Sequence, residues 1–286
     1  MNNENNNLEN IKNNIRIGLA ILVIISIVIG VYVNIIGIGN KGKDNKENQV
    51  DVATETIVDS EDDNVKSESF DNVESIVVEL AAGDLEVSYG NVDKISVDYS
   101  MPNNMAPEIK IDNGVLSIRK KDTSNKKWNF LKSGKLVGNI SVIIPRDAEL
   151  ANVDIDVEYG DVEVKDVRAD LINLALECGD IDIKSIEATT ICIEESLGDI
   201  NIDKINCDKI EINQSAGDIT VDDSSIKTTE VKSSLGDVDL SGDLEEVSVK
   251  SSMGDIDVKS DKAESEMKLD LNVDAGNISV NGRDYK

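Results

Sequence analysis

This 286-residue chain carries aspartates at a regular spacing, and their carboxylates are its best candidates for binding a cation. A glycine precedes each of them, and the steps between the glycines are 19 residues four times and then 18. Stacked repeats would place the carboxylates about 4.8 Å apart. Clustered carboxylate oxygens are ligands that calcium prefers. One hypothesis is therefore a calcium ladder formed by Asp161, Asp180, Asp199, Asp218, Asp237 and Asp255.

A structural role for these aspartates is the interpretation that we favour. Like charges at this spacing repel by about 1 kcal/mol per neighbour in water, so something must offset the repulsion. An aspartate in a turn commonly accepts a hydrogen bond from a backbone N–H of its own turn. The glycine-rich nonapeptide of calcium-loaded β-rolls is absent, and the period differs from it. We therefore expect no metal and no cofactor, with the calcium ladder kept as the alternative.

The spacing itself predicts the fold class. A period of this size indicates a solenoid whose repeats hide their apolar faces only by stacking. We predict an all-β, single-stranded right- or left-handed β-solenoid of the parallel β-helix kind, with regular coils from about residue 160 and an irregular N-terminal β cap over 73–145. Glycine suits the corners because it adopts positive φ without strain. The inward columns include Val162, Ile181, Ile200, Ile219 and Val238, and then Val164, Ile183, Ile202, Val221 and Leu240.

The segment before the repeats predicts a membrane anchor. Residues 17–38 are free of charge and mostly aliphatic, which is long enough to cross a bilayer as a helix. A cleaved signal peptide is the alternative, but no A-x-A-like site follows the apolar run. The predicted organisation is a short tail over 1–14, a transmembrane helix over 15–39, a flexible acidic stalk over 40–70 and the solenoid over 71–286. Basic residues flank the span almost evenly, and the long acidic part favours a C-terminal domain outside the cell.

Composition excludes several function classes. The net charge is −28 and the chain has no histidine, so neither a Ser-His nor a Cys-His pair nor an imidazole metal ligand exists. Nucleic-acid phosphate would be repelled. A polysaccharide-active β-helix enzyme would need a cleft of clustered basic and acidic groups. The arginines beyond the predicted span are scattered, namely Arg119, Arg146, Arg168 and Arg283. We expect no enzyme and no small-molecule substrate.

The three cysteines cannot form a complete intrachain disulfide set, because their number is odd. Cys178 shares its repeat column with Leu197, Ala216 and other apolar residues, and Cys207 aligns with alanines. Both are predicted to be small core residues. Cys192 lies between two inward isoleucines and is predicted to face outward.

A resemblance supports this fold. Residues 139–150 (NISVIIPRDAEL), then VDIDVEYGDVEV and the repeated GDI coils, resemble the bacterial putative-adhesin family of β-strand repeat proteins, also grouped with "toastrack" envelope domains. The similarity covers about residues 73–286. It implies a membrane-tethered β-solenoid with a role in adhesion or in envelope stress signalling, and it supplies no catalytic motif.

Two functions remain open from the sequence. The first is a non-enzymatic, membrane-anchored cell-surface module that presents an acidic scaffold to a protein or envelope partner. The second is a sensor or regulatory subunit of an envelope stress response that acts through a membrane-protein partner. In both, the chain would sit in the cell membrane as a single-pass protein without a nucleic-acid partner.

Overall fold

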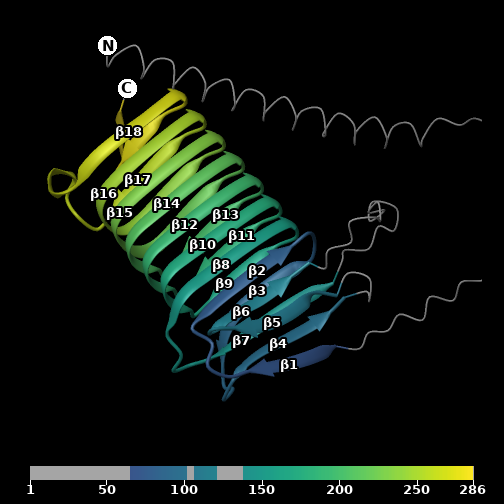
Figure 1. Cartoon of the computed structure of the whole chain (residues 1–286). Helices are drawn as coiled ribbons and strands as arrows, with labels where there is room; N and C mark the ends of the chain where they lie inside the picture. Colours follow the sequence, from purple (N-terminus) through teal and green to yellow (C-terminus); the bar gives the residue numbers. More distant parts are fainter. Residues whose placement is uncertain (1–64, 102–105, 121–137, 286) are drawn as a thin grey trace, which may run out of the picture. The chain divides into compact units, whose positions relative to one another are not determined.

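A computed structural model describes residues 65–101, 106–120 and 138–285 of the chain (Figure 1). The predicted tail, the predicted transmembrane helix over 15–39 and most of the predicted stalk lie outside these residues. Within the described ranges, no helix combines the length and the apolar composition that crossing a membrane requires. The described part is almost entirely strand, with one short 3-10 helix, η2 (Glu264–Glu266).

The repeats form a β-solenoid in which each coil contributes one short and one long strand. Equivalent strands of successive coils pair in parallel, for example Ile181 with Ile200 and Ile191 with Ile210. This confirms the predicted all-β solenoid. The short strands are β9 (Val162–Lys165), β11 (Ile181–Lys184) and β13 (Ile200–Asp203), and the long strands are β8 (Leu150–Tyr159), β10 (Arg168–Cys178), β12 (Glu187–Leu197) and β14 (Asn206–Ala216).

Later coils keep the register despite changes in repeat length. A short and a long strand run together in β15 (Ile219–Leu235) and again in β16 (Val238–Met253), which are followed by β17 (Ile256–Ser260) and β18 (Lys268–Ala275). The 18-residue step arises from a register shift between Val221 and Ser224. The last step, from Gly254 to Gly276, is longer than the others. Its extra residues lie in the loop that holds η2, between the regular strands β17 and β18.

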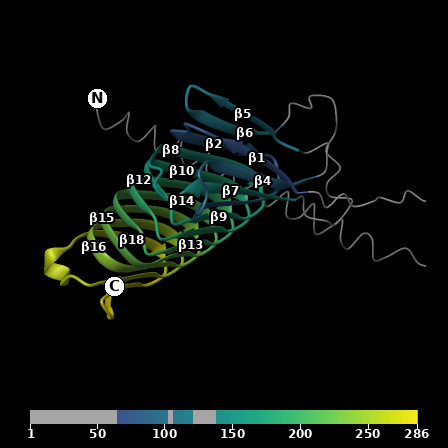
Figure 2. The ribbon, with the colours of Figure 1, turned by 90° about the horizontal axis from the view of Figure 1, so that it is seen from below.

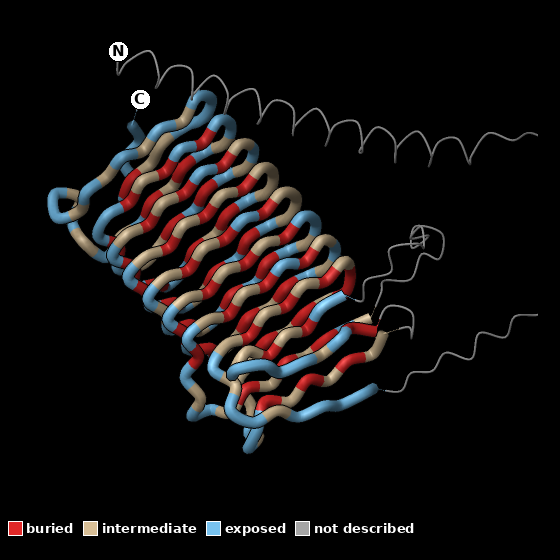
Figure 3. Tube along the Cα trace, viewed as in Figure 1, coloured by how far each residue is buried: buried red, intermediate tan, exposed pale blue. Residues whose placement is uncertain are grey.

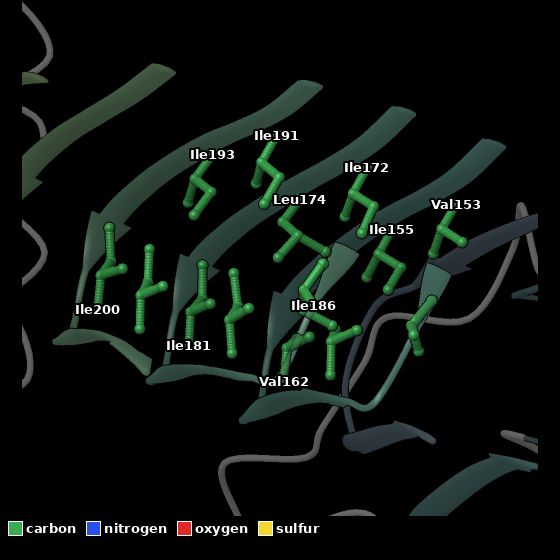
Figure 4. Close-up of a cluster of buried hydrophobic side chains, with 14 of the residues drawn as sticks. Val153, Ile155, Val162, Ile172, Leu174, Ile181, Ile186, Ile191, Ile193 and Ile200 are labelled. Atoms are coloured by element: carbon green, nitrogen blue, oxygen red, sulfur yellow. The ribbon is translucent and has the colours of Figure 1, made fainter. Parts of the chain in front are cut away.

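The core follows the predicted alternation. Burial alternates along strands such as β11 and β13, and the buried positions of successive coils line up along the solenoid (Figure 3). Ile181 and Ile200 are fully buried, and isoleucines from the long strands, such as Ile191 and Ile193, lie across from them (Figure 4). Each coil leaves half of its aliphatic surface unburied unless the next coil covers it, so the stacking itself supplies the hydrophobic stabilisation.

The N-terminal region is more regular than the sequence suggested. Strands β2 (Ser75–Leu80) and β3 (Asp84–Gly90) pair in parallel with β8 and β9, so they form a coil that lies directly on the later repeats. On their other side lie β6 (Val115–Arg119) and β7 (Asn139–Pro145), also in parallel (Figures 1 and 2). The predicted irregular cap over 73–145 is therefore too wide, because β2 and β3 belong to the stack.

Antiparallel strands end the stack at this side. β4 (Ile95–Ser100) pairs with β7, and β5 (Glu108–Asp112) pairs with β6 through a hairpin whose turn residues, Asn113 and Gly114, both have positive φ. β1 (Lys66–Phe70) pairs antiparallel with β4 along its whole length. The stalk predicted over 40–70 is thus wrong for residues 66–70, because pairing with the open edge of β4 satisfies their backbone groups.

A second Asn-Gly hairpin closes the other end. β19 (Ile278–Val280) pairs in parallel with β17, and β20 (Arg283–Tyr285) folds back antiparallel on β19. Asn281 and Gly282 both have positive φ, as a tight primed turn requires.

Candidate functional site

The glycines that precede the aspartates form one corner of every coil. Gly179 has φ +139° and Gly198 has φ +148°, a region that favours glycine. A Cβ placed on Gly198 would lie 1.7 Å from the carbonyl oxygen of Gly179. The corner therefore requires glycine for two reasons, its backbone conformation and the close approach of successive coils.

The six predicted aspartates stand in one line beside this corner, which we call the aspartate ladder, and Asp84 extends it towards the cap. The Oδ1 atom of each accepts a hydrogen bond from the backbone N–H of the next aspartate, for example Asp199 N–H to Asp180 Oδ1 at 2.9 Å. The same bond joins the remaining neighbours at 2.7–3.1 Å and ends at Asn277. The carboxylates do cap backbone N–H groups, but the donor comes from the next coil and not from the aspartate's own turn.

This arrangement explains how the like charges are tolerated. Each carboxylate is a strong acceptor for a backbone N–H that the corner would otherwise leave to solvent. Within the described residues, no group of three or more His, Cys, Asp or Glu side chains is placed to hold a metal ion. The ladder serves as coil-to-coil fastening, and the calcium alternative stays a prediction for experiment.

Just inside the same corner, four buried side chains are polar. Glu195, Gln214, Ser233 and Ser251 stack in register and are each at most 5% exposed, and we call them the polar column. Gln214 Nε2 donates to Glu195 Oε2 and to the carbonyl oxygen of Gly198, both at 2.8 Å. Glu195 Oε1, Gln214 Oε1 and both serine hydroxyls are buried with no hydrogen-bond partner. A buried polar atom without a partner costs free energy, so the column weakens the core locally.

Glu195 is the one carboxyl of the column. Burial raises its pKa to about 7, and the hydrogen bond from Gln214 only partly opposes that rise. Sequence analysis missed the column, although the signal was present. Three residues before each corner glycine the side chain changes from Leu176 to Glu195, and it then stays polar through Gln214 and Ser233 to Ser251.

Outside the corner, the pattern is reversed. A continuous row of mostly apolar side chains stacks in register from coil to coil, and we call it the apolar edge: Tyr159, Cys178, Leu197, Ala216, Leu235, Met253 and Ala275. Tyr159 is 42% exposed, Leu235 44% and Met253 55%. The edge immediately precedes the glycines, so its side chains lie at the ends of the long strands and are half-buried or exposed.

The apolar edge corrects one cysteine prediction. Cys178 belongs to it and is exposed, whereas it was predicted to lie in the core. Simple alternation would point Cys178 inward, but the strand ends at the glycine corner and the alternation ends with it. Cys207 is buried as predicted, and burial raises the pKa of its thiol to about 12. Cys192 is half-buried on the outward side of β12, consistent with its predicted outward direction.

The second corner of each coil is ordinary. In four successive coils a non-glycine residue with positive φ forms it, namely Asp166, Ser185, Lys204 and Asp223, and in the next coil Gly242 lies at this corner. The residues that follow, Val167, Ile186 and Ile205, are buried. In these three coils polar groups lie outside this corner and aliphatic groups inside it, whereas the following coil buries Ser224, whose hydroxyl donates to the Asp222 carbonyl oxygen at 2.7 Å.

Comparisons with known proteins place this architecture. A family model described as Toastrack DUF4097 matches residues 73–285. The solved structure of a putative adhesin from Bacteroides fragilis has a TM-score of 0.54 at 15% identity, covering 77% of this chain and 98% of that one. A putative adhesin from Parabacteroides distasonis has a TM-score of 0.48 at 15% identity, covering 77% and 97%. A putative lipid binding protein from the same organism has 0.45 at 17%, with the same coverage. No curated protein matches the chain. At these identities, the likeness concerns the fold alone.

Proposed function

The chain belongs to the Toastrack DUF4097 family, and from that premise we propose that it is a non-enzymatic, membrane-anchored module. Its solenoid stands outside the cell and presents a rigid acidic scaffold to a protein or envelope partner. The anchor is the apolar segment over 15–39, and the segment that follows it provides the spacer.

The aspartate ladder is the observation that carries this proposal. The regularly spaced carboxylates were the chain's best candidates for chemistry, and each one fastens the backbone of the next coil. A set of groups engaged in this way builds a scaffold. What remains for function is the outer surface, where parallel stacking repeats the same side-chain position once per coil.

The outer surface suits a scaffold that contacts a partner. Ion pairs join neighbouring coils along the long strands, such as Arg168 with Glu187 at 3.0 Å and Lys209 with Glu230 at 3.3 Å. Exposed pairs of this kind contribute at most about 1 kcal/mol each, so they keep the surface solvated more than they stabilise the fold. The net charge of −28 favours soluble presentation and electrostatic selection of basic partners.

Protease treatment of intact cells tests the proposal. Trypsin can cut at Lys41, Lys43 and Lys46, between the predicted anchor and the solenoid. We expect a fragment containing the solenoid to leave intact cells, while a cytoplasmic marker protein stays uncut. A domain that becomes sensitive only after lysis would contradict surface presentation.

Capture of membrane proteins separates the two functions that the sequence left open. Crosslinking of the intact chain in cells, followed by isolation through a C-terminal tag, would recover a membrane-protein partner if the chain is a regulatory subunit. The adhesin-like function predicts instead that deletion of the chain lowers cell attachment and leaves the envelope stress response unchanged.

A further inference from the structure

The corner that carries the aspartate ladder has the reverse of a normal polarity pattern. Within the coils that contain Glu195, Gln214 and Ser233, polar side chains are buried while Leu197, Ala216 and Leu235 lie outside. Folding alone would favour the opposite placement, because it leaves apolar area in water and buried polar atoms unpaired. The apolar edge therefore has a cost for the free chain.

The apolar edge is continuous from coil to coil, which makes it a candidate binding surface. Parallel register places its members in one row without a polar interruption, from Tyr159 to Ala275. Single exposed apolar residues are ordinary on proteins, whereas a contiguous apolar patch with a polar border marks an interaction site. Binding would cover the area that folding leaves exposed.

The charges beside the edge define the partner's chemistry. The aspartate ladder runs along one side, and its hydrogen bonds engage Oδ1 of carboxylates that stay exposed at the surface. The other side carries Glu158, Glu177 and Asp274, with serines at the equivalent positions between them. An apolar row with carboxylates along the whole of one side and towards both ends of the other fits an apolar face that positive charges border. Another copy of this chain, or an anionic lipid surface, would be repelled.

The spacing along the edge favours a helix. Neighbouring coils are about 4.8 Å apart, and a helix repeats its apolar face every 5.4 Å, roughly. Side chains on one face of an extended strand are about 6.7 Å apart, which differs more from the coil spacing, so a strand would lose its match to the edge over fewer coils. The edge from Tyr159 to Ala275 spans about 29 Å at this coil spacing, the length of a helix of roughly 19 residues.

We propose that the apolar edge and the aspartate ladder together bind an amphipathic helix of another protein, with an apolar face bordered by lysine or arginine. The inference rests on the proposed function, because it names the partner class that the scaffold would receive. It locates the contact on one corner of the solenoid.

A peptide titration on the purified full chain tests this proposal. The probe is a fluorescent helical peptide of about 20 residues, with leucine at i, i+3, i+4 and i+7 positions and lysine on both borders. The matched control peptide carries glutamate in place of every lysine. We expect the lysine peptide to bind at least about tenfold more tightly, and its affinity to fall as sodium chloride rises from about 50 to about 300 mM.

Variants locate the contact. Leu235→Gln with Met253→Gln removes the two most exposed large apolar side chains of the edge, and we expect at least about tenfold weaker binding. The matched control is Val65→Gln with Ile111→Gln, which also removes exposed aliphatic groups but from the capped end. Equal affinity for both peptides, or equal affinity of the edge variant and the unchanged chain, would overturn the proposal.

Cysteine labelling gives a second readout on the unchanged chain. Cys178 lies in the edge, whereas Cys192 lies on the outward side of β12. Bound lysine peptide should slow the alkylation of Cys178 and leave Cys192 unaffected. Protection of Cys178 by phosphatidylglycerol vesicles but not by the peptide would make the edge a membrane contact, and protection that rises with chain concentration alone would make it a self-association surface. Either outcome refutes the proposal.

The two proposals can fail separately. Peptide binding by a chain that proteases cannot reach on intact cells would retain the edge as a binding site and refute surface presentation. Protease release without peptide binding would support surface presentation and refute the edge as a binding site.

Discussion

The two corners of each coil solve the same geometric problem in different ways. At the second corner, Ser185 and Lys204 adopt positive φ near +55°, with Ile186 and Ile205 buried just behind them. At the glycine corner, the backbones of successive coils approach so closely that no Cβ fits, polar groups are buried and apolar groups are exposed. Either kind of corner can close a coil, so the unusual placement at the glycine corner is not required by the turn.

The difference indicates that the second corner has only a structural role. Polar outside and apolar inside is the arrangement that burial favours, and the second corner follows it in the coils of Ser185 and Lys204. Ser224, which is buried at this corner in the next coil, has hydrogen-bond partners, unlike the serines of the polar column. The glycine corner departs from it over several coils, and proteins depart from local rules mainly where function requires it. Substitutions at the two corners, in the core between them and along the ladder can therefore test whether the contrast is real.

The largest effect should come from the aliphatic core that both corners enclose. Ile202 is 2% exposed and points inward, while its neighbour Asn201 is exposed. Ile202→Asp places an unpaired charge among aliphatic side chains and should lower the free energy of unfolding by roughly 4 kcal/mol or more. Asn201→Asp should change it by less than about 1 kcal/mol. Thermal melting of both variants checks this, and equal melting temperatures would contradict the assigned register.

The two corners should differ sharply in their tolerance of a side chain. A Cβ on Gly217 would lie 1.7 Å from the carbonyl oxygen of Gly198, and φ is +135°. Gly217→Ala should therefore destabilise the chain by about 2–4 kcal/mol. Lys204→Ala at the second corner keeps a Cβ that is already present, so a loss within about 1 kcal/mol is expected. Denaturant unfolding measures both, and similar losses would show that the corners are equivalent.

Removing the buried carboxyl should reveal the cost of the polar column. The pKa of Glu195 rises from 4.5 to about 7 on folding, so the folded state holds the proton more tightly than the unfolded state. The stability associated with this group is present below pH 4.5 and is lost as the pH rises towards 7. Glu195→Leu should therefore stabilise the chain at pH 8, by about 1–3 kcal/mol.

The pH dependence supplies the control for that variant. The melting temperature of Glu195→Leu should change less between pH 5 and pH 8 than that of the unchanged chain, since other titrating groups are common to both. If Glu195→Leu gained more stability at pH 5 than at pH 8, the raised pKa of Glu195 would be contradicted.

The aspartate ladder should give the smallest effect. Asp199→Asn retains an oxygen that can accept the Asp218 N–H and removes one repelling charge, so the free energy of unfolding should stay within about 1 kcal/mol of that of the unchanged chain. A chelator should leave the melting temperature unchanged, and sodium chloride should raise it as much as calcium chloride at equal ionic strength. A calcium-specific rise that disappears in Asp199→Asn and Asp218→Asn would establish the calcium ladder instead.

Much of the fold could be predicted because its signals are local and repeated. The glycine period gave the coil length, and the alternation at Ile181 and Ile183 gave the inward columns, which burial confirms. Cys178 shows where this reasoning fails. Alternation assigns it to the core, but whether an inward direction meets other atoms depends on where the corner ends the core, and a single strand does not contain that information.

The order in which the coils stack could not be predicted from the sequence either. Strands β2 and β3 look like the start of an irregular region, yet they pair with β8 and β9 far along the chain, and Asp84 takes its place in the ladder. Gly242-Asp243 repeats the dipeptide but lies at the second corner, where Gly242 pairs with Ser224. The same two residues thus have different roles according to their register.

Stacked β coils with glycine corners follow from the sequence, because hydrophobic alternation and backbone conformation are properties of short segments. The folded chain was needed to show that the carboxylates fasten one coil to the next, that Glu195 is buried and that Cys178, Leu235 and Met253 line an exposed edge. These features depend on which coil lies above and where the core ends, since hydrogen-bond partners and burial arise between segments and not within them.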